Sequence, residues 1–389
     1  MKLNEDKLHS FVIRDQRSTI ADISEIVEKY YDLGKAVEIR KLDMGDSNFN
    51  YSITLEKDHV KTQYFGQLYN AGKSLANVKF ELALRAYFMR NMKSSMKCAL
   101  HYSTKDGGYT VKCQCAENDR VRYFCLFDFL EGNSLDRDEW AYGKMSAELL
   151  KGCAKGIALY HIGAYGFTPP AECVDITTDY EEELAEYKRV FTEEFEKCRK
   201  GSTYAYYDYF AEYQPRLLEL LNRYTKNYLA AKDKLPTCMC HMDTSPQNYL
   251  FNDDLQPIGI CDLDWSQEHP RILDICWFIN EGLCKFDSER VSNRLEIDDI
   301  VAFINAYDDA IEEAGNLKPG KLTKTERELL LDLFQLVTIN CGFYIIWVYI
   351  LEDNPSNTNE FNTFWGNWTK TALEFVETHY DEFKRKIVG

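Results

Sequence analysis

A short segment near the middle of the chain places polar residues directly after two apolar runs. His241, Asp243 and Asn248 follow the run TCMC in the pattern H-x-D-x4-N, and Asp262 and Asp264 follow the run IGIC. A carboxylate can take the proton of an attacking hydroxyl, and Mg²⁺ prefers carboxylate and other oxygen ligands. These residue types suit phosphoryl transfer from a nucleotide, with Asp243 as the base and with Asn248 and Asp262 at the metal.

The segment also resembles a known family. HMDTSPQNYLF is similar to the catalytic loop of the aminoglycoside phosphotransferase family, relatives of protein kinases that include choline, homoserine and N-acetylhexosamine kinases. GICDLDWSQEHPRILDICWF resembles the metal-binding segment of that family. The resemblance implies that Asp243 is the catalytic base and that Asn248 and Asp262 hold Mg²⁺. It further implies that Asp274 braces the loop and that His241 orients it by hydrogen bonding.

The resemblance extends upstream to a nucleotide site and covers Val37 to Ile279 in all. MGDSNFNYSI resembles the phosphate-binding turn, NVKFELAL the helix that carries a glutamate, and CLFDFLEG the hinge that reads adenine. The cofactors implied are ATP or GTP, together with Mg²⁺. The implied nucleotide-binding residues are Gly45, Ser47 and Asn48 in the turn, Glu81 on the helix, and Phe127, Asp128 and Phe129 at the hinge.

One position departs from the family pattern. In YFGQLYNAG, Gln67 stands where the family has a strand lysine or arginine, and a neutral amide cannot make a charge-assisted phosphate contact. N-acetylhexosamine kinases resemble this chain in carrying glutamine there, so we include Gln67 in the nucleotide site. A shifted strand would instead make Lys61 the cation. A third hypothesis is a nucleotide-binding pseudokinase. The presence of Asp243, Asn248 and Asp262 argues against this hypothesis.

The acceptor is expected to be a small molecule that carries a hydroxyl group. Aromatic side chains with neighbouring amides and acids suit a sugar or an amino sugar. We rank a sugar or N-acetylhexosamine-like amino sugar first, and an aminoglycoside, choline or homoserine as alternatives. The candidate acceptor-side residues are Asp264, Trp265, Trp277, Asn280 and Glu281.

The surrounding patterns predict two lobes. Residues 1–127 show a helix after residue 18, a three-stranded meander over 37–70, a helix over 77–92 and further strands, and form a nucleotide-binding lobe. Residues 128–389 are mainly helical and form the catalytic and substrate-binding lobe. The apolar stretch 336–351 is read as a buried helix, since it is shorter than the roughly 20 residues that span a bilayer. The predicted class is α+β, with a bilobal protein-kinase-like fold.

Composition limits the partners. With 46 Lys and Arg against 63 Asp and Glu, the formal charge of −17 argues against nucleic acid as a partner. Thirteen cysteines and a start without a secretory leader favour reduced thiols in the cytoplasm, with no membrane contact. The chain is expected to be a monomer or a homodimer. The pairs Cys113/Cys115 and Cys238/Cys240 are expected to be buried strand thiols rather than zinc ligands, and His161 to be a hydrogen-bonded core histidine.

Overall fold

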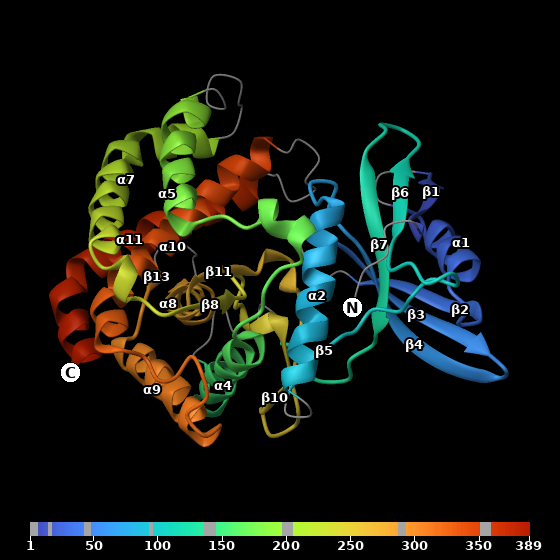
Figure 1. Ribbon diagram of the computed structural model, residues 1–389. Coiled ribbons are helices and arrows are strands. Elements are labelled where there is room, and N and C mark those ends of the chain that lie inside the picture. The colour runs from blue at the N-terminus through green and yellow to red at the C-terminus, as the bar shows by residue number, and fades with distance from the viewer. Residues whose placement is uncertain are drawn as a thin grey trace. The chain divides into compact units, whose positions relative to one another are not determined.

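The computed structural model describes residues 7–14, 18–42, 48–92, 96–135, 145–196, 205–286, 293–350 and 359–389. The chain forms two compact units (Figure 1). The first unit comprises Met1–Arg90, Lys97–Glu131 and Thr168–Ile176, and the second comprises Asn91–Met96, Gly132–Phe167 and Thr177–Gly389. The first unit thus takes a short segment from the middle of the chain in addition to its N-terminal part.

A six-stranded sheet forms the centre of the first unit. Its strand order is β1-β6-β7-β4-β3-β2, and all neighbouring strands are antiparallel except β1 and β6. The predicted meander is confirmed as β2, β3 and β4, whereas β1 was not predicted. The strands of this unit are β1 (His9–Ile13), β2 (Lys35–Leu42), β3 (Phe49–Lys57), β4 (Val60–Leu68), β5 (Lys97–Cys98), β6 (Val111–Cys115) and β7 (Val121–Asp128).

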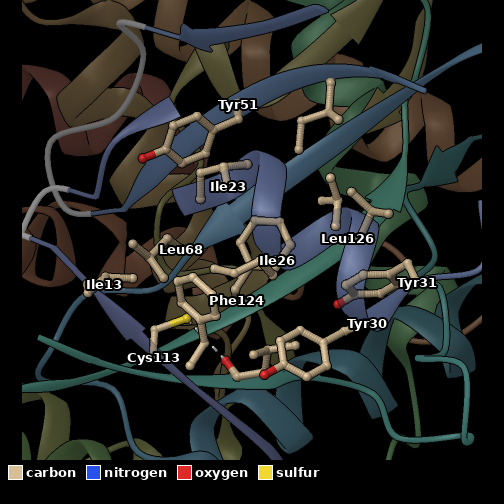
Figure 2. Packing of buried hydrophobic residues seen from close by; sticks show 14 of the residues in the cluster. Ile13, Ile23, Ile26, Tyr30, Tyr31, Tyr51, Leu68, Cys113, Phe124 and Leu126 are labelled. Atoms are coloured by element: carbon tan, nitrogen blue, oxygen red, sulfur yellow. Dashed lines mark hydrogen bonds between the residues drawn. The ribbon is translucent and has the colours of Figure 1, made fainter. Parts of the chain in front are cut away.

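Two helices lie on opposite faces of this sheet, α1 (Ile20–Tyr30) and α2 (Leu75–Met92) (Figure 1). Helix α1 begins at a capping box, in which the Thr19 hydroxyl accepts from the Asp22 amide and the Asp22 carboxylate accepts from the Thr19 amide. Figure 2 shows how Ile23 and Ile26 of α1 pack among buried side chains of the strands. The face toward α2 has its own apolar cluster, which includes Phe127.

Because side chains alternate between the two faces of a strand, one strand can contribute to both clusters, as β4 and β7 do. In β7, Phe124 and Leu126 belong to the cluster around α1, whereas Cys125 and Phe127 belong to the cluster on the α2 side. Of the nucleotide-binding residues implied by the sequence, Gln67, Phe127 and Asp128 lie in strands of this sheet, whose two faces are both covered.

The second unit is mainly helical, with four short strands around the Asp243 loop. Strand β8 pairs antiparallel with β11, and β9 with β10. Its helices and strands are α4 (Ala147–Ala164), α5 (Tyr180–Arg189), η3 (Val190–Glu194), α7 (Ala205–Leu229), η4 (Lys232–Lys234), β8 (Thr237–Cys240), η5 (Pro246–Asn248), β9 (Tyr249–Phe251), β10 (Pro257–Ile260), η6 (Leu263–Trp265), β11 (Gln267–Pro270), α8 (Ile272–Phe278), η7 (Ile279–Leu283), β12 (Lys285–Phe286), β13 (Asn293–Arg294), α9 (Ile297–Glu313), α10 (Lys324–Ile350) and α11 (Asn359–Val388). The segment taken by the first unit holds η2 (Ala171–Ile176).

Two helix predictions differ from the structure in their extent. The charged pattern over 176–200 predicts one continuous helix, but α5 begins at Tyr180 and passes into the π-helix η3 at Val190. Residues 336–350 of the apolar stretch do form a helix, and α10 starts earlier, at Lys324, with buried side chains such as Leu336 and Ile339. None of the described helices combines the length and the apolar character that crossing a membrane requires.

Candidate active site

The loop that carries Asp243 begins at the end of β8, and a buried carboxylate holds its first residues. Asp274 of α8 is fully buried; its Oδ2 accepts from the His241 amide at 2.7 Å and its Oδ1 from the Met242 amide at 2.8 Å. The Thr244 hydroxyl donates to the Asp274 carbonyl oxygen at 2.8 Å. Met242 has a φ of 63°, a left-handed conformation that is unfavourable for a side chain of this size. The hydrogen bonds of Asp274 therefore stabilise this unfavourable turn, which is the bracing role that the family resemblance implies.

Hydrogen bonds of Asn248 and His241 stabilise the rest of the loop and link it to Cys261. Asn248 Nδ2 donates to the Asp243 carbonyl oxygen at 2.8 Å, and the Asn248 carbonyl accepts from the Cys261 amide at 2.9 Å. His241 Nε2 lies 2.8 Å from the carbonyl oxygen of Cys261. Cys261 directly precedes Asp262. These contacts bring together the segments of Asp243, Asn248 and Asp262 within the second unit.

Asp262 stands where β10 passes into η6. Strand β10 pairs with β9 so that Ile260 lies opposite Tyr249, and this register places Asn248 and Asp262 at the same end of the two strands. Asp262 has φ 56° and ψ 58°, a left-handed conformation that Asp tolerates better than most residues. An amide and a carboxylate thus follow the same end of one strand pair, adjacent to the Asp243 loop.

A second layer of buried polar side chains supports Asp274. His161 of α4 is fully buried; its Nε2 lies 2.9 Å from Asp274 Oδ2 and its Nδ1 2.9 Å from the Tyr307 hydroxyl. The prediction of a hydrogen-bonded core histidine is confirmed. Burial opposes the charged imidazolium, but Cys238 and Asp274 outweigh burial and raise the pKa of His161. The Asp274 carboxylate is therefore fixed from both the loop and the helical core.

The cysteine pairs are buried, as the sequence predicts. Cys113 and Cys115 lie in β6, and Cys238 and Cys240 in β8, all as free thiols. One nitrogen of His161 and the sulfurs of the β8 pair lie within 4.8 Å of one another. Since both ring nitrogens of His161 take part in hydrogen bonds to Tyr307 and Asp274, neither offers a metal a lone pair in this arrangement. We assign no metal to these thiols.

The first unit carries the residues expected at the nucleotide phosphates. Gln67 of β4 is 3% exposed, and Glu81 of α2 is fully buried. Asn48 is buried, and its Oδ1 accepts from the Asn70 amide at 2.9 Å. Gly45 and Ser47, which the sequence places in the phosphate-binding turn, lie outside the described residues.

Comparison with known families decides the class. Residues 38–309 match the model of the phosphotransferase enzyme family. The chain belongs to this family. It is accordingly an ATP-dependent small-molecule phosphotransferase, a kinase that acts on hydroxyl acceptors. The narrower assignment to an N-acetylhexosamine kinase branch stays a prediction.

Solved structures of similar fold cover nearly the whole chain. A microcompartment-associated aminopropanol kinase is 14% identical, with 94% of this chain and 99% of that chain covered and a TM-score of 0.63. An amicoumacin kinase in complex with AMP-PNP and Ca²⁺ is 12% identical, with 93% and 98% covered and a TM-score of 0.61. A spectinomycin phosphotransferase in complex with ADP is 13% identical, with 91% and 98% covered and a TM-score of 0.56. No curated protein matches the chain in sequence. The likeness confirms the α+β, kinase-like fold.

In this phosphotransferase, the residues expected at the hinge lie at and directly after the end of β7. Phe127 is fully buried, with its ring centroid 6.1 Å from that of Phe65. Asp128 exchanges hydrogen bonds with Leu100: the Asp128 amide donates to the Leu100 carbonyl at 2.9 Å, and Asp128 Oδ2 accepts from the Leu100 amide at 3.3 Å. Phe129, directly after the strand, is partly buried. Hydrogen bonds to Leu100 thus hold this end of β7 in place.

Lys61 does not take the place of Gln67. It lies on the exposed part of β4, opposite Glu56 near the hairpin turn, whereas Gln67 lies opposite Asn50. Six residues of strand separate the two by about 20 Å. The alternative of a shifted strand is therefore not supported by the register.

The five candidate acceptor residues fall into two groups. Asp264 and Trp265 belong to η6, and the Trp265 side chain is 37% exposed. Trp277 lies in α8, and Asn280 and Glu281 in the π-helix η7. Asn280 is fully buried: it donates to the Thr338 hydroxyl at 3.0 Å and accepts from the Cys341 thiol at 3.3 Å. The Asn280 amide is therefore engaged in the helical core, whereas Trp265 faces solvent.

One residue of the candidate nucleotide site was missed. Arg85 forms a buried ion pair with Glu81 on the same helix. The spacing E-x-x-x-R in FELALRAY is the i, i+4 pattern that joins acids and bases on a helix, and it was the available signal.

Proposed function

We propose that the protein transfers the γ-phosphate of ATP to a hydroxyl group of an amino sugar, with Asp243 as the general base. Asn248 and Asp262 would hold Mg²⁺. The observation that carries the proposal is the hydrogen-bonded frame of the loop, in which Asp274 fixes the residues before Asp243 while Asn248 and Cys261 tie its end to Asp262. Such a frame provides the positioning on which phosphoryl transfer depends.

The donor set fits a hard divalent cation. Asn248 Nδ2 is used in the hydrogen bond to the Asp243 carbonyl, which leaves Oδ1 as the atom of this amide that can face a cation. Asp262 supplies a carboxylate at the same end of the β9–β10 hairpin. When bound, Mg²⁺ would offset the negative charge that develops on the transferred phosphate.

Asp243 acts on the acceptor rather than on the nucleotide. Its carboxylate orients the attacking hydroxyl and accepts the proton as the new phosphate ester bond forms and the bond between the γ-phosphate and ADP breaks. The left-handed Met242 before it and the Asn248 hydrogen bond after it restrict the backbone from both sides. The Asp243 side chain is thereby presented by a fixed turn.

An acidic environment favours an acceptor that carries an amine. Burial raises the pKa of the Cys341 thiol, and the charges of Glu281, Cys284 and Asp243 raise it further. Glu281 is 9% exposed in η7, and π-helical turns are frequent at functional sites. Carboxylates whose charges act on the same region attract an ammonium group more strongly than a neutral hydroxyl.

A pseudokinase is the second candidate, and the observation that favours it is Gln67. This side chain is buried at the position expected for a phosphate-binding cation, and it carries no charge. Under this alternative the protein binds ATP without turnover. The two candidates make different predictions for ADP release, which a single assay can compare.

The test is ADP release by the full chain with Mg²⁺-ATP and a matched series of acceptors. The series contains glucosamine, N-acetylglucosamine and glucose, together with a pool of aminoglycosides, choline and homoserine. The proposal predicts ADP release with an amine-bearing sugar and no release by the Asp243→Asn variant. Equal release with glucose would refute the amine preference, and ATP binding without release with any acceptor would support the pseudokinase.

A further inference from the structure

Arg85 of α2 forms a buried ion pair with Glu81. Glu81 is fully buried and Arg85 is 3% exposed. Arg85 Nε and Nη2 both donate to Glu81 Oε1, at 2.7 Å and 2.5 Å. Burial opposes the charge of Arg85, yet Glu81 more than offsets burial and the pKa of the guanidinium is raised. Arg85 therefore stays charged inside the first unit.

The same guanidinium contacts two further segments. Its Nη1 donates to the Ala99 carbonyl oxygen at 3.3 Å, and its carbon lies 4.9 Å from the centre of the Phe127 ring. Ala99 precedes Leu100, which pairs with Asp128 along the edge of β7. A planar group with donors in fixed directions can hold a carboxylate, a carbonyl and an aromatic ring at once, which an ammonium cannot. Arg85 thus joins α2 to the end of β7.

Strand β4 adds a neutral residue to this cluster. Gln67 lies opposite Cys125 of β7. Burial raises the pKa of the Cys125 thiol to about 12, and the charge of Glu81 contributes to the rise. Gln67 Oε1 is buried and accepts no hydrogen bond from the described residues. Among those residues, the cation in contact with Glu81 is therefore on its own helix and not on β4.

We propose that Arg85 is a positioning residue for ATP, which holds the Glu81 carboxylate and the Phe127 ring in one arrangement without a cation from β4. The inference rests on the proposed function, in which Glu81 and Phe127 belong to the nucleotide site. It has two consequences. Loss of the planar guanidinium weakens ATP binding. A lysine introduced at position 67 does not strengthen it, because Arg85 already neutralises the charge of Glu81 through Oε1, although Glu81 Oε2 accepts no hydrogen bond from the described residues.

Arg122 provides a matched control in the same sheet. It is 5% exposed, donates to the Tyr69 carbonyl at 3.2 Å and lies 4.9 Å from the centre of the Phe49 ring. Side chains alternate along β7, so Arg122 points to the face of the α1 cluster and Phe127 to the face of α2. Arginine-to-lysine substitutions at 85 and 122 therefore each remove a guanidinium group, on opposite faces of the sheet.

The test is calorimetric titration of the full chain with Mg²⁺-ATP in the absence of acceptor, for the wild type, Arg85→Lys, Arg122→Lys and Gln67→Lys. We expect Arg85→Lys to raise the dissociation constant for ATP by about tenfold or more. We expect Arg122→Lys to change this constant by less than about threefold, at a similar loss of melting temperature. Gln67→Lys should bind ATP no more tightly than the wild type.

Two results would overturn the inference while the proposed function stands. One is wild-type ATP affinity in a folded Arg85→Lys variant, which leaves Arg85 with a purely structural role. The other is tighter ATP binding by Gln67→Lys, which shows that Glu81 is available to a strand cation. If Arg85→Lys does not fold, the Gln67→Lys titration alone decides. A wild type that binds no ATP contradicts the proposed function itself.

Discussion

The carboxylate of Asp274 and the imidazole of His161 lie 2.9 Å apart, and neither side chain has any exposed surface. Asp274 also accepts the backbone amides of His241 and Met242. One carboxylate therefore links the helical core to the loop that presents Asp243. The consequence is that the geometry of the loop depends on a residue that does not touch the substrate.

Asp274→Asn is expected to slow catalysis. An amide in place of the carboxylate turns one acceptor into a donor that faces the backbone amides, and an unsatisfied buried donor costs about 1–3 kcal/mol. We expect kcat to fall by about tenfold or more because the Asp243 loop loses its position. Steady-state kinetics with saturating ATP and acceptor measures the effect.

The control for this variant is Asp332→Asn in α10. Asp332 is 2% exposed and accepts from Asn227 Nδ2 at 3.0 Å, so its replacement disturbs a comparably buried hydrogen bond away from the loop. It should lower the melting temperature and leave kcat unchanged. Equal losses of kcat in the two variants would show that Asp274 acts only through stability.

The ion pair between Arg271 and Glu326 is expected to be the most sensitive charge pair in the second unit. Both residues are fully buried, and Arg271 donates to Glu326 Oε1 at 2.7 Å and Oε2 at 2.9 Å. Arg271→Met leaves the buried Glu326 carboxylate without a cation and should lower the free energy of unfolding by about 3–5 kcal/mol. Denaturant titration gives this value. The double variant Arg271→Met/Glu326→Met should lose less than the sum of the two single variants, and strict additivity would rule out the coupling.

Glu183 is expected to make the stability of the folded protein depend on pH in the acidic range. Burial opposes its charge, but hydrogen bonds and the charge of His269 outweigh burial and lower the pKa of Glu183 below its ordinary 4.5. The stabilisation is therefore present above pH 4.5 and is lost as the pH falls through the lower folded-state pKa, because the unfolded chain takes up the proton first. Glu183→Gln should flatten the decline of melting temperature below pH 4.5. The exposed neighbour Glu182→Gln should keep the wild-type slope, and an unchanged slope in Glu183→Gln would contradict the assignment.

Gly152 is expected to tolerate no side chain. A Cβ at this position of α4 would lie 2.2 Å from the carbonyl oxygen of Leu255, in the turn between β9 and β10, and a backbone atom cannot move away alone. Gly152→Ala should destabilise the second unit by about 1–3 kcal/mol, as overpacking typically does. Thermal unfolding measures this against Gly72→Ala, where the nearest atom lies at an ordinary 3.4 Å. Equal melting temperatures would show that α4 can shift from the turn.

The sequence predicted the elements that have strong periodicity or clear turns. The meander of β2, β3 and β4 follows from β-branched and aromatic residues between turn residues, and α2 from apolar spacing. The π-helix η3 at Val190 was missed, because one extra residue in a helical turn leaves the apolar pattern over 176–200 nearly intact. Strand β1 was missed because its five residues depend on parallel pairing with β6, which local sequence does not show.

In the candidate site too, local patterns could be predicted from the sequence and long-range contacts could not. Asp243, Asn248 and Asp262 form a local pattern, so a single segment of sequence was sufficient to select them. Asp274 was recognised through a family resemblance, but its hydrogen bonds to His241 and Met242 span more than thirty residues and depend on the fold. Arg85 has a local signal with Glu81, yet nothing in the sequence shows that the pair is buried against Phe127.

The most direct test of the central claim is single-turnover phosphoryl transfer by the wild type and the Asp243→Asn variant, with ATP affinity measured by calorimetry on the same preparations. The account predicts that the variant transfers phosphate about 10²–10⁴-fold more slowly, the usual contribution of a general base, at an ATP affinity within about threefold of the wild type. Wild-type transfer rates in a folded Asp243→Asn variant would contradict the assignment of Asp243 as the base.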